Sequence, residues 1–194
     1  MPKKKLVMVL ASASPRRKKL LKKIVKKFKI VTSQVKETKI KANTPLGFAV
    51  KAALAKAEDV AKKQKDALVV GADTIVVLGN KILGKPKTKK EAVAMLKSLA
   101  GKTHQVITGI AVVDTETGEK ATDYEITKVK MKKVTDQNIL DYVASGKPMD
   151  KAGAYGIQEI EQSFGINIKG DYDNVVGLPV KKLKSLIQYV KVNK

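Results

Sequence analysis

LVMVLASASPRRKK, residues 6–19, predicts a buried strand, a tight turn of small residues and the start of a helix. The uninterrupted apolar run at its start is typical of a central strand that is covered on both faces. Ser14 can cap the helix that Pro15 opens at its first position. The free amides of that first turn and the forked guanidinium groups of Arg16 and Arg17 would all meet an anion there. The sequence therefore predicts a phosphate-binding site at this strand-to-helix turn.

The composition of the chain limits the classes of protein to which it can belong. Its 194 residues are enough for one substantial core. It has no cysteine, which excludes a disulfide framework, a thiol nucleophile and a zinc site built on thiolates. No segment is apolar for long enough to span a membrane, and the apolar run near the start is too short for a signal peptide. We therefore expect a cytoplasmic protein without a membrane partner.

The charge of the chain is strongly positive. The formal net charge is +22, from 40 Lys+Arg against 18 Asp+Glu, so nucleic-acid binding is one hypothesis. Nucleic acid is not expected as the main partner, because the lysines are spread over nearly every expected helix and aromatic residues make up only 4% of the chain. The arginines, in contrast, are adjacent, at Arg16 and Arg17, which indicates a bidentate task that lysine cannot perform.

Helical and strand-like patterns are mixed along the chain and predict an α/β fold. Apolar residues at helical spacing predict helices at 15–27, 45–64, 88–99, 135–143 and 178–190. Continuous or alternating apolar runs predict strands at 6–10, 29–33, 67–78, 81–83, 103–114, 120–134 and 164–168. No linker or repeat interrupts these patterns. We therefore expect residues 1–194 to form a single domain, with a long twisted mixed sheet, helices and two lobes around a cleft.

Asp73 is the strongest candidate for chemistry. It interrupts a run of valines and isoleucines at 67–78, where a carboxylate is costly unless it has a partner or a function. A phosphate site combined with such an acid suggests hydrolysis of a phosphate ester or anhydride, which needs cations and a base that orients water. Glu37 could join Asp73 around a divalent metal through hard oxygen ligands. The alternative for Asp73 is a structural role, as an acid that caps its turn through Thr74.

Several motifs, in order along almost the whole chain, resemble the Maf family of nucleoside triphosphate pyrophosphatases. They are ASASPRR at 11–17, GADT at 71–74, GKP at 84–86, LAGKTHQVITG at 99–109, DKAGAYGIQ at 150–158 and NVVGLP at 174–179. The resemblance implies a fold similar to that of inosine-triphosphate pyrophosphatases. It also implies hydrolysis of a nucleoside triphosphate to the monophosphate and pyrophosphate, with a divalent cation, Mg²⁺ or Mn²⁺, and it suggests a homodimer.

The same resemblance implies roles for individual residues. Asp73 would be the general base that activates water, and Glu37 and Asp73 would lie near the metal. The substrate phosphates would be bound by Ser12, Arg16, Arg17, Lys56 and Lys85. Preference for dTTP and UTP, extended to modified pyrimidine nucleotides, is indicated by Arg16, Thr74 and Gln158, which match that branch of the family.

Three positions depart from the family pattern. Lys36 stands where relatives usually have a second acid, Glu159 replaces a usual glycine, and Asp173 stands where a small hydroxyl residue is common. The alternative hypothesis is a regulator of cell division (septum formation) or a basic nucleic-acid-binding protein with little catalysis. It rests on the family's association with arrest of septum formation and on the basic surface.

Overall fold

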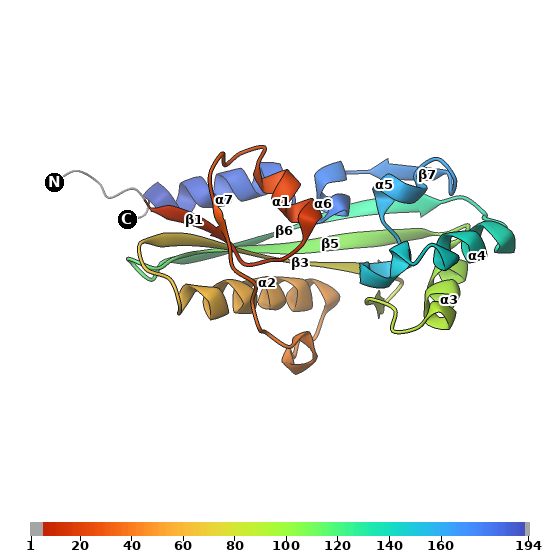
Figure 1. The fold of residues 1–194 in the computed structure, drawn as a ribbon, viewed down its shortest axis with the longest axis horizontal. Helices are drawn as coiled ribbons and strands as arrows, with labels where there is room; N and C mark the ends of the chain where they lie inside the picture. Colours follow the sequence, from red (N-terminus) through yellow and green to blue (C-terminus); the bar gives the residue numbers. More distant parts are fainter. Residues whose placement is uncertain (1–5, 193–194) are drawn as a thin grey trace. The chain divides into compact units, whose positions relative to one another are not determined.

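The expected mixed α/β fold is confirmed by a computed structural model that describes residues 6–192 (Figure 1). Within these residues the strands form one mixed sheet in the order β2-β1-β3-β5-β6-β7, with β4 paired to β3. The strands β2, β1 and β3 are parallel, whereas β4 and β7 pair antiparallel with their neighbours. The strands are β1 (Val7–Leu10), β2 (Lys29–Ile30), β3 (Ala67–Leu78), β4 (Lys81–Leu83), β5 (Thr103–Asp114), β6 (Lys120–Met131) and β7 (Ile166–Lys169).

The helices begin largely where the sequence places their caps. Ser14, Thr88 and Thr135 each accept a hydrogen bond from the backbone N–H three residues further on, so each one caps a helix as expected. The α-helices are α1 (Pro15–Leu21), α2 (Pro45–Ala61), α3 (Lys89–Leu99), α4 (Asp136–Ala144), α5 (Ile157–Ile160), α6 (Tyr172–Val176) and α7 (Val180–Val192). None of the helices in residues 6–192 combines the length and hydropathy that a bilayer crossing requires.

The first helix is shorter than its sequence pattern predicts. The apolar spacing predicted a helix to residue 27, but α1 ends at Leu21 and continues as turns in which Lys23 and Ile24 donate to carbonyls three residues back. Lysines that lie four residues apart repel one another along residues 18–27, where no acid offsets them. The pattern also missed α6 and the short 3₁₀ helix η1 (Glu37–Lys39).

The described residues belong to two compact units, in accord with the expected two lobes. The first unit comprises residues up to Asp73, together with Thr108–Glu125 and the residues from Gly177 onward. The second comprises Thr74–Ile107 and Ile126–Val176. The expectation of a single domain stays a prediction.

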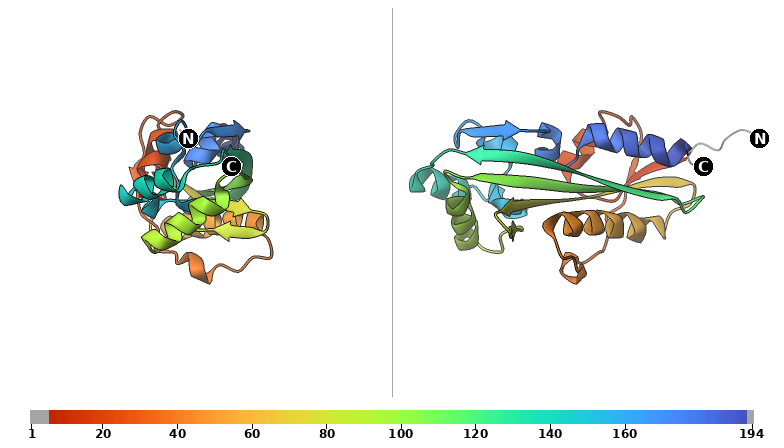
Figure 2. Two further views of the ribbon diagram at one scale, coloured as in Figure 1. Left: turned by 90° about the vertical axis from the view of Figure 1, so that its right-hand side faces the viewer. Right: turned by 180° about the vertical axis from the view of Figure 1, so that it is seen from behind.

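In the first unit, α2 lies against the sheet at very short range. Figures 1 and 2 show α2 on one face of the sheet and α1 and α7 on the other. Gly71 in β3 and Gly109 in β5 face α2, and a Cβ atom on Gly71 would lie 2.2 Å from the carbonyl oxygen of Ala53. A Cβ on Gly109 would lie 2.3 Å from the carbonyl oxygen of Ala49. The backbone of α2 therefore rests directly on β3 and β5, at a distance that no larger residue permits.

The second unit has its own core, and His104 of β5 is one of its buried polar side chains. Its ring is 2% exposed, and its Nε2 lies 2.7 Å from the hydroxyl oxygen of Tyr155. Burial lowers the pKa of His104 to about 4, and burial also raises the pKa of Tyr155. His104 is therefore neutral at physiological pH and forms part of the packed core. Tyr155 belongs to a cluster of buried side chains that includes Leu96, Leu99 and Ile139 of α3 and α4.

We expect Gly71→Ala to lower the free energy of unfolding by about 3 kcal/mol, because α2 must retreat from β3 to make room for the methyl group. Urea unfolding followed by far-UV circular dichroism measures this loss. Gly84→Ala is the matched control, since a Cβ at Gly84 meets nothing within 4 Å and its backbone is not left-handed. The control is expected to change stability by less than about 0.5 kcal/mol. Equal losses in the two variants would contradict the close approach.

The buried neutral His104 predicts a specific dependence of stability on pH. Below pH 6.5 the unfolded chain binds a proton on this ring, whereas the folded protein does not until about pH 4. The folded state therefore loses stability as the pH falls from 6.5 to 4, by about 3 kcal/mol in total. The difference between the unfolding free energies of wild type and His104→Gln, measured across this range, should shrink by that amount. A constant difference would show that the ring titrates freely in the folded state.

Candidate functional site

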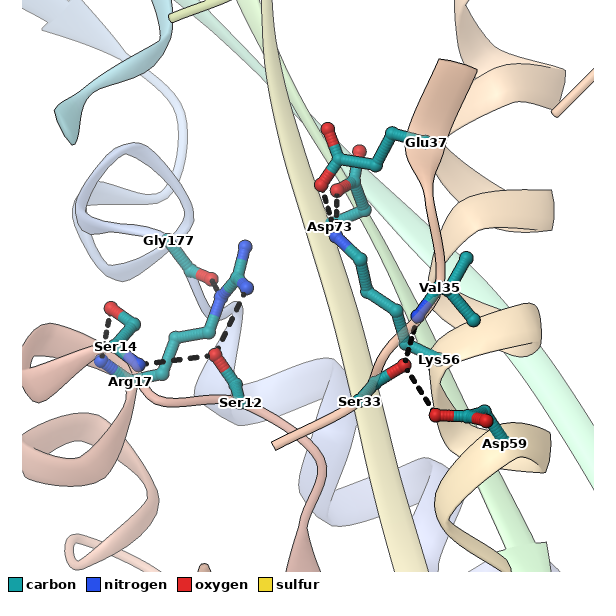
Figure 3. A network of polar contacts seen from close by, with 10 residues as sticks. All are labelled: Ser12, Ser14, Arg17, Ser33, Val35, Glu37, Lys56, Asp59, Asp73 and Gly177. Carbon is teal, nitrogen blue, oxygen red and sulfur yellow. Dashed lines mark hydrogen bonds and ion pairs between the residues drawn. The ribbon is translucent and has the colours of Figure 1, made fainter. Parts of the chain in front are cut away.

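The turn after β1 presents an arginine whose guanidinium is held from several sides. Arg17 Nε donates to the carbonyl oxygen of Gly177 at 2.9 Å, and its Nη1 donates to Ser12 Oγ at 3.3 Å (Figure 3). The backbone N–H of Arg17 donates to Ser14 Oγ, and that of Ser14 donates to Ser12 Oγ. The two serines thus join the turn to the start of α1. This geometry supports the sequence-based view that Ser12 and Arg17 act together.

The electrostatic surroundings of Arg17 include two carboxylates. Burial lowers the pKa of Arg17, the charge of Asp73 raises it, Arg16 lowers it and Glu37 raises it. A guanidinium stays charged in a protein, so the positive group faces the acids in the same unit. The positive charge of Arg17 and the negative charges of the two acids therefore attract one another.

A lysine bridges the two acids. Lys56 Nζ lies 2.6 Å from Glu37 Oε1 and 2.6 Å from Asp73 Oδ1, as Figure 3 shows. The side chain of Asp73 is 6% exposed, that of Lys56 is 13% exposed and that of Glu37 is 47% exposed. The second carboxylate oxygen of Asp73, Oδ2, is buried and has no hydrogen-bond partner within the described residues. The acid thus has one oxygen paired and one oxygen buried without a partner, which is a costly arrangement unless a ligand uses it.

The packing of α2 explains how Lys56 reaches Asp73. Asp73 lies two residues after Gly71 on β3, where the strand permits close contact with the helix. Lys56 lies on α2 between Ala53 and Ala57, whose atoms lie closest to Gly71. The same contact that removes space for a Cβ therefore brings the ammonium group to the carboxylate.

Asp59, one turn after Lys56, was not singled out by the sequence, yet it anchors the segment that leads to Glu37. Its Oδ2 accepts from Ser33 Oγ at 3.0 Å and from the backbone N–H of Gln34 at 2.8 Å. These hydrogen bonds lower the pKa of Asp59. On a lysine-rich helix an aspartate resembles an ordinary solvated acid, so the sequence carried no signal for this role.

The structure brings five of the predicted site residues into one part of the first unit (Figure 3): Ser12, Arg17, Glu37, Lys56 and Asp73. Arg16, next to Arg17 on α1, is half-buried. Thr74, Lys85 and Gln158 belong to the second unit, where Lys85 and Gln158 are exposed. The roles of all these residues stay predictions.

In the second unit, the helix that carries Gln158 is fixed by a polar network. Glu159 Oε2 accepts from the hydroxyl of Tyr142 at 2.6 Å, and Glu159 Oε1 lies 3.1 Å from Lys151 Nζ. The Tyr142 hydroxyl in turn accepts from the backbone N–H of Gly156 at 3.1 Å. Glu159, one of the departures from the family pattern, therefore holds the start of α5.

The acidic pair has the chemistry of a divalent-cation site. Among residues 6–192 no group of three or more Asp, Glu, His or Cys side chains could hold a metal ion. Mg²⁺ needs no such cage, because it is commonly held by one or two carboxylates together with water and substrate phosphates. Glu37 and Asp73 supply two hard oxygen donors that already share one cationic group, and the buried Asp73 Oδ2 has no hydrogen-bond partner among the described residues. The residues present therefore fit the cation that the sequence resemblance implies.

Comparisons with known proteins identify a family and several relatives of the chain. A family model described as "Maf-like protein" matches residues 7–190. The "dTTP/UTP pyrophosphatase" of Alkaliphilus metalliredigens (strain QYMF) is 49% identical over 181 residues, which cover 93% of this chain and 94% of the relative. The protein of the same name from Clostridium botulinum (strain 657 / Type Ba4) is 47% identical over 190 residues, covering 95% and 97%. The Staphylococcus aureus Ham1 protein has a similar fold, with a TM-score of 0.53 at 15% identity over 94% of this chain and 98% of that one.

The anchoring role of Asp59 can be tested by itself. We expect Asp59→Ala to increase the hydrogen-exchange rates of the Gln34 and Val35 amides by at least about ten-fold, because the carboxylate that holds Ser33 and Gln34 is lost. Hydrogen exchange followed by mass spectrometry measures this change. Asp123→Ala, which removes another acid of the first unit that pairs with a lysine, is the control. Unchanged exchange in residues 33–37 of Asp59→Ala would contradict the anchor.

Proposed function

The chain belongs to the Maf family, and we propose that it hydrolyses dTTP and UTP to the nucleoside monophosphate and pyrophosphate. Relatives at 49% and 47% identity carry the name dTTP/UTP pyrophosphatase. The single observation that carries the proposal is the state of Asp73, a buried carboxylate with one oxygen on Lys56 and the other without a hydrogen-bond partner among the described residues. It lies in the same unit as an arginine whose fork is oriented by protein oxygens.

Asp73 acts in this proposal as the general base. Its Oδ2 accepts a proton from water, whose oxygen attacks phosphorus while the bond to the pyrophosphate leaving group breaks. Before a cation binds, the ion pair with Lys56 fixes the orientation of the Asp73 carboxylate. A base that is held in position lowers the activation barrier, because the base and the water do not have to lose orientational freedom during the reaction.

The cationic groups bind the triphosphate. Ser12, Arg16 and Arg17 hold phosphate oxygens, and the planar fork of Arg17 suits paired contacts with a phosphate. Lys56 and Lys85 neutralise further charge. When it is bound by Glu37 and Asp73, a divalent cation supplies additional neutralisation of the developing phosphate charge. The net charge of +22 speeds the encounter with a triphosphate and makes it sensitive to salt.

Base preference is assigned to Arg16, Thr74 and Gln158. The amide of Gln158 carries both a donor and an acceptor, which a pyrimidine with a carbonyl next to an N–H can satisfy together. The network of Glu159, Tyr142 and Lys151 supports this role, because it holds the helix from which Gln158 projects. A fixed amide discriminates between bases better than a mobile one.

We expect Asp73→Asn to lower kcat for dTTP and UTP by about 10²–10⁴-fold with a nearly unchanged KM, because asparagine keeps the shape but cannot accept the proton. Release of pyrophosphate from a panel of nucleoside triphosphates, with Mg²⁺ or Mn²⁺, measures the effect. Asp136→Asn is the control, since Asp136 also lies 2.6 Å from a lysine, Lys97, but its side chain is 71% exposed.

The outcomes of this experiment separate the hypotheses. Loss of hydrolysis in Asp73→Asn, with retained nucleotide binding, supports Asp73 as the base. Retained hydrolysis with reduced thermal stability would assign Asp73 a structural role. Absence of pyrophosphate release from every nucleotide in the wild-type protein would favour the alternative of a nucleic-acid-binding or division-regulating protein.

A further inference from the structure

We propose that Lys56 is a built-in counter-ion that a divalent cation displaces from Glu37 and Asp73, and that the displaced ammonium group then serves the triphosphate. The first step concerns the chain and the cation alone. The second step rests on the function proposed above. Lys56 is thus more than one further phosphate ligand, because it holds the cation site until the cation arrives.

The first support is the position of the ammonium nitrogen. Lys56 Nζ is 2.6 Å from an oxygen of each acid, and Figure 3 shows both carboxylates converging on it. A divalent cation held by the same two oxygens would lie about 2.0–2.5 Å from each of them. The nitrogen and such a cation would therefore occupy the same space. Binding of the cation between these oxygens requires that the nitrogen leave.

The second support is the charge of the cluster. Two carboxylates share one ammonium, so the trio of Glu37, Lys56 and Asp73 carries one negative charge in excess. The buried Oδ2 of Asp73 also lacks a hydrogen-bond partner within the described residues. The ammonium therefore does not satisfy Asp73 completely. A divalent cation in place of the ammonium brings a second positive charge between two carboxylates that both attract it, in addition to the charge of Arg17 that already acts on both acids.

The third support is what can move. The backbone of Lys56 is held in α2, which rests directly on β3 at Gly71. Its side chain has a flexible stem of four carbons with several rotatable bonds, and 13% of the side chain is exposed. Displacement is therefore a rotation of one side chain. The helix and both acids can stay in place.

The decisive experiment measures Mn²⁺ binding without nucleotide, by electron paramagnetic resonance of the free ion. We expect Lys56→Met to bind Mn²⁺ at least about ten-fold more tightly than the wild type, because no ammonium competes for the carboxylates. Lys120→Met is the matched control. Lys120 also lies 2.6 Å from a glutamate of the first unit, Glu58, and its replacement removes the same charge. The control is expected to keep wild-type affinity within about two-fold, since long-range charge is screened.

Thermal unfolding gives a second readout that does not depend on activity. Lys56→Met leaves two acids without their counter-ion, so its Tm without metal should fall below that of the wild type. Saturating Mn²⁺ should then raise the Tm of this variant by more than that of the wild type, because the cation binds the folded state more tightly. Lys56→Gln, which keeps hydrogen-bond donors but no charge, serves as the second variant if Lys56→Met does not fold. It should show the same direction of change.

Each result decides the matter. Unchanged or weaker Mn²⁺ binding in the folded Lys56 variants would overturn the displacement. The lysine would then have no effect on the affinity for the cation, or would help to hold it. Tighter binding that persists in Lys56→Met combined with Glu37→Gln would also overturn it, because the cation would not use the bridged oxygens. Pyrophosphate release by the wild type is measured separately. Its absence would remove the proposed function and the second step, and would leave the displacement of Lys56 as measured.

Discussion

The close approach of α2 to β3 is the constraint on which the candidate site depends. Gly71 has no Cβ, and any Cβ there would lie 2.2 Å from a carbonyl oxygen of the helix. The missing side chain lets the backbone of α2 rest on β3. The short distance between Lys56 Nζ and Asp73 Oδ1 follows from that contact. The same contact between α2 and β3 therefore stabilises the first unit and places Lys56 beside Asp73.

The bridge explains how a carboxylate can stand in the middle of an apolar strand. Burial of Asp73 without a partner would cost several kcal/mol, and one ammonium offsets much of that cost through Oδ1. The other oxygen is buried without a hydrogen-bond partner among the described residues, and a purely structural ion pair would gain nothing from this. The chain as a whole carries a charge of +22, yet at this position two carboxylates share one ammonium. The net charge of the chain therefore does not describe the charges around Asp73, which include both acids and Arg17.

The sequence predicted the parts of the structure that depend on near neighbours. Ser14, Thr88 and Thr135 cap their helices because a cap needs only the next three residues. The predicted end of α1 was wrong, because apolar spacing favoured a longer helix while the repulsion between lysines shortened it. The pairing of Lys56 with Glu37 and Asp73 joins residues 19 and 17 positions apart through the tertiary fold. One lysine among 40 Lys+Arg carries no local mark of that pairing, and only the motif resemblance singled it out.

Glu159 shows why a departure from a family pattern has to be judged from its contacts. Lys151 is buried, with 7% of its side chain exposed, and its other acidic partner, Asp150, is 64% exposed. A glycine at position 159 would remove the less exposed of the two acids and would leave the hydroxyl of Tyr142 without its acceptor. The glutamate thus compensates a buried cation and orients the tyrosine that accepts from Gly156. Substitutions of these three side chains are therefore expected to be non-additive, because replacing one alone leaves a charge or a donor of the others unpaired.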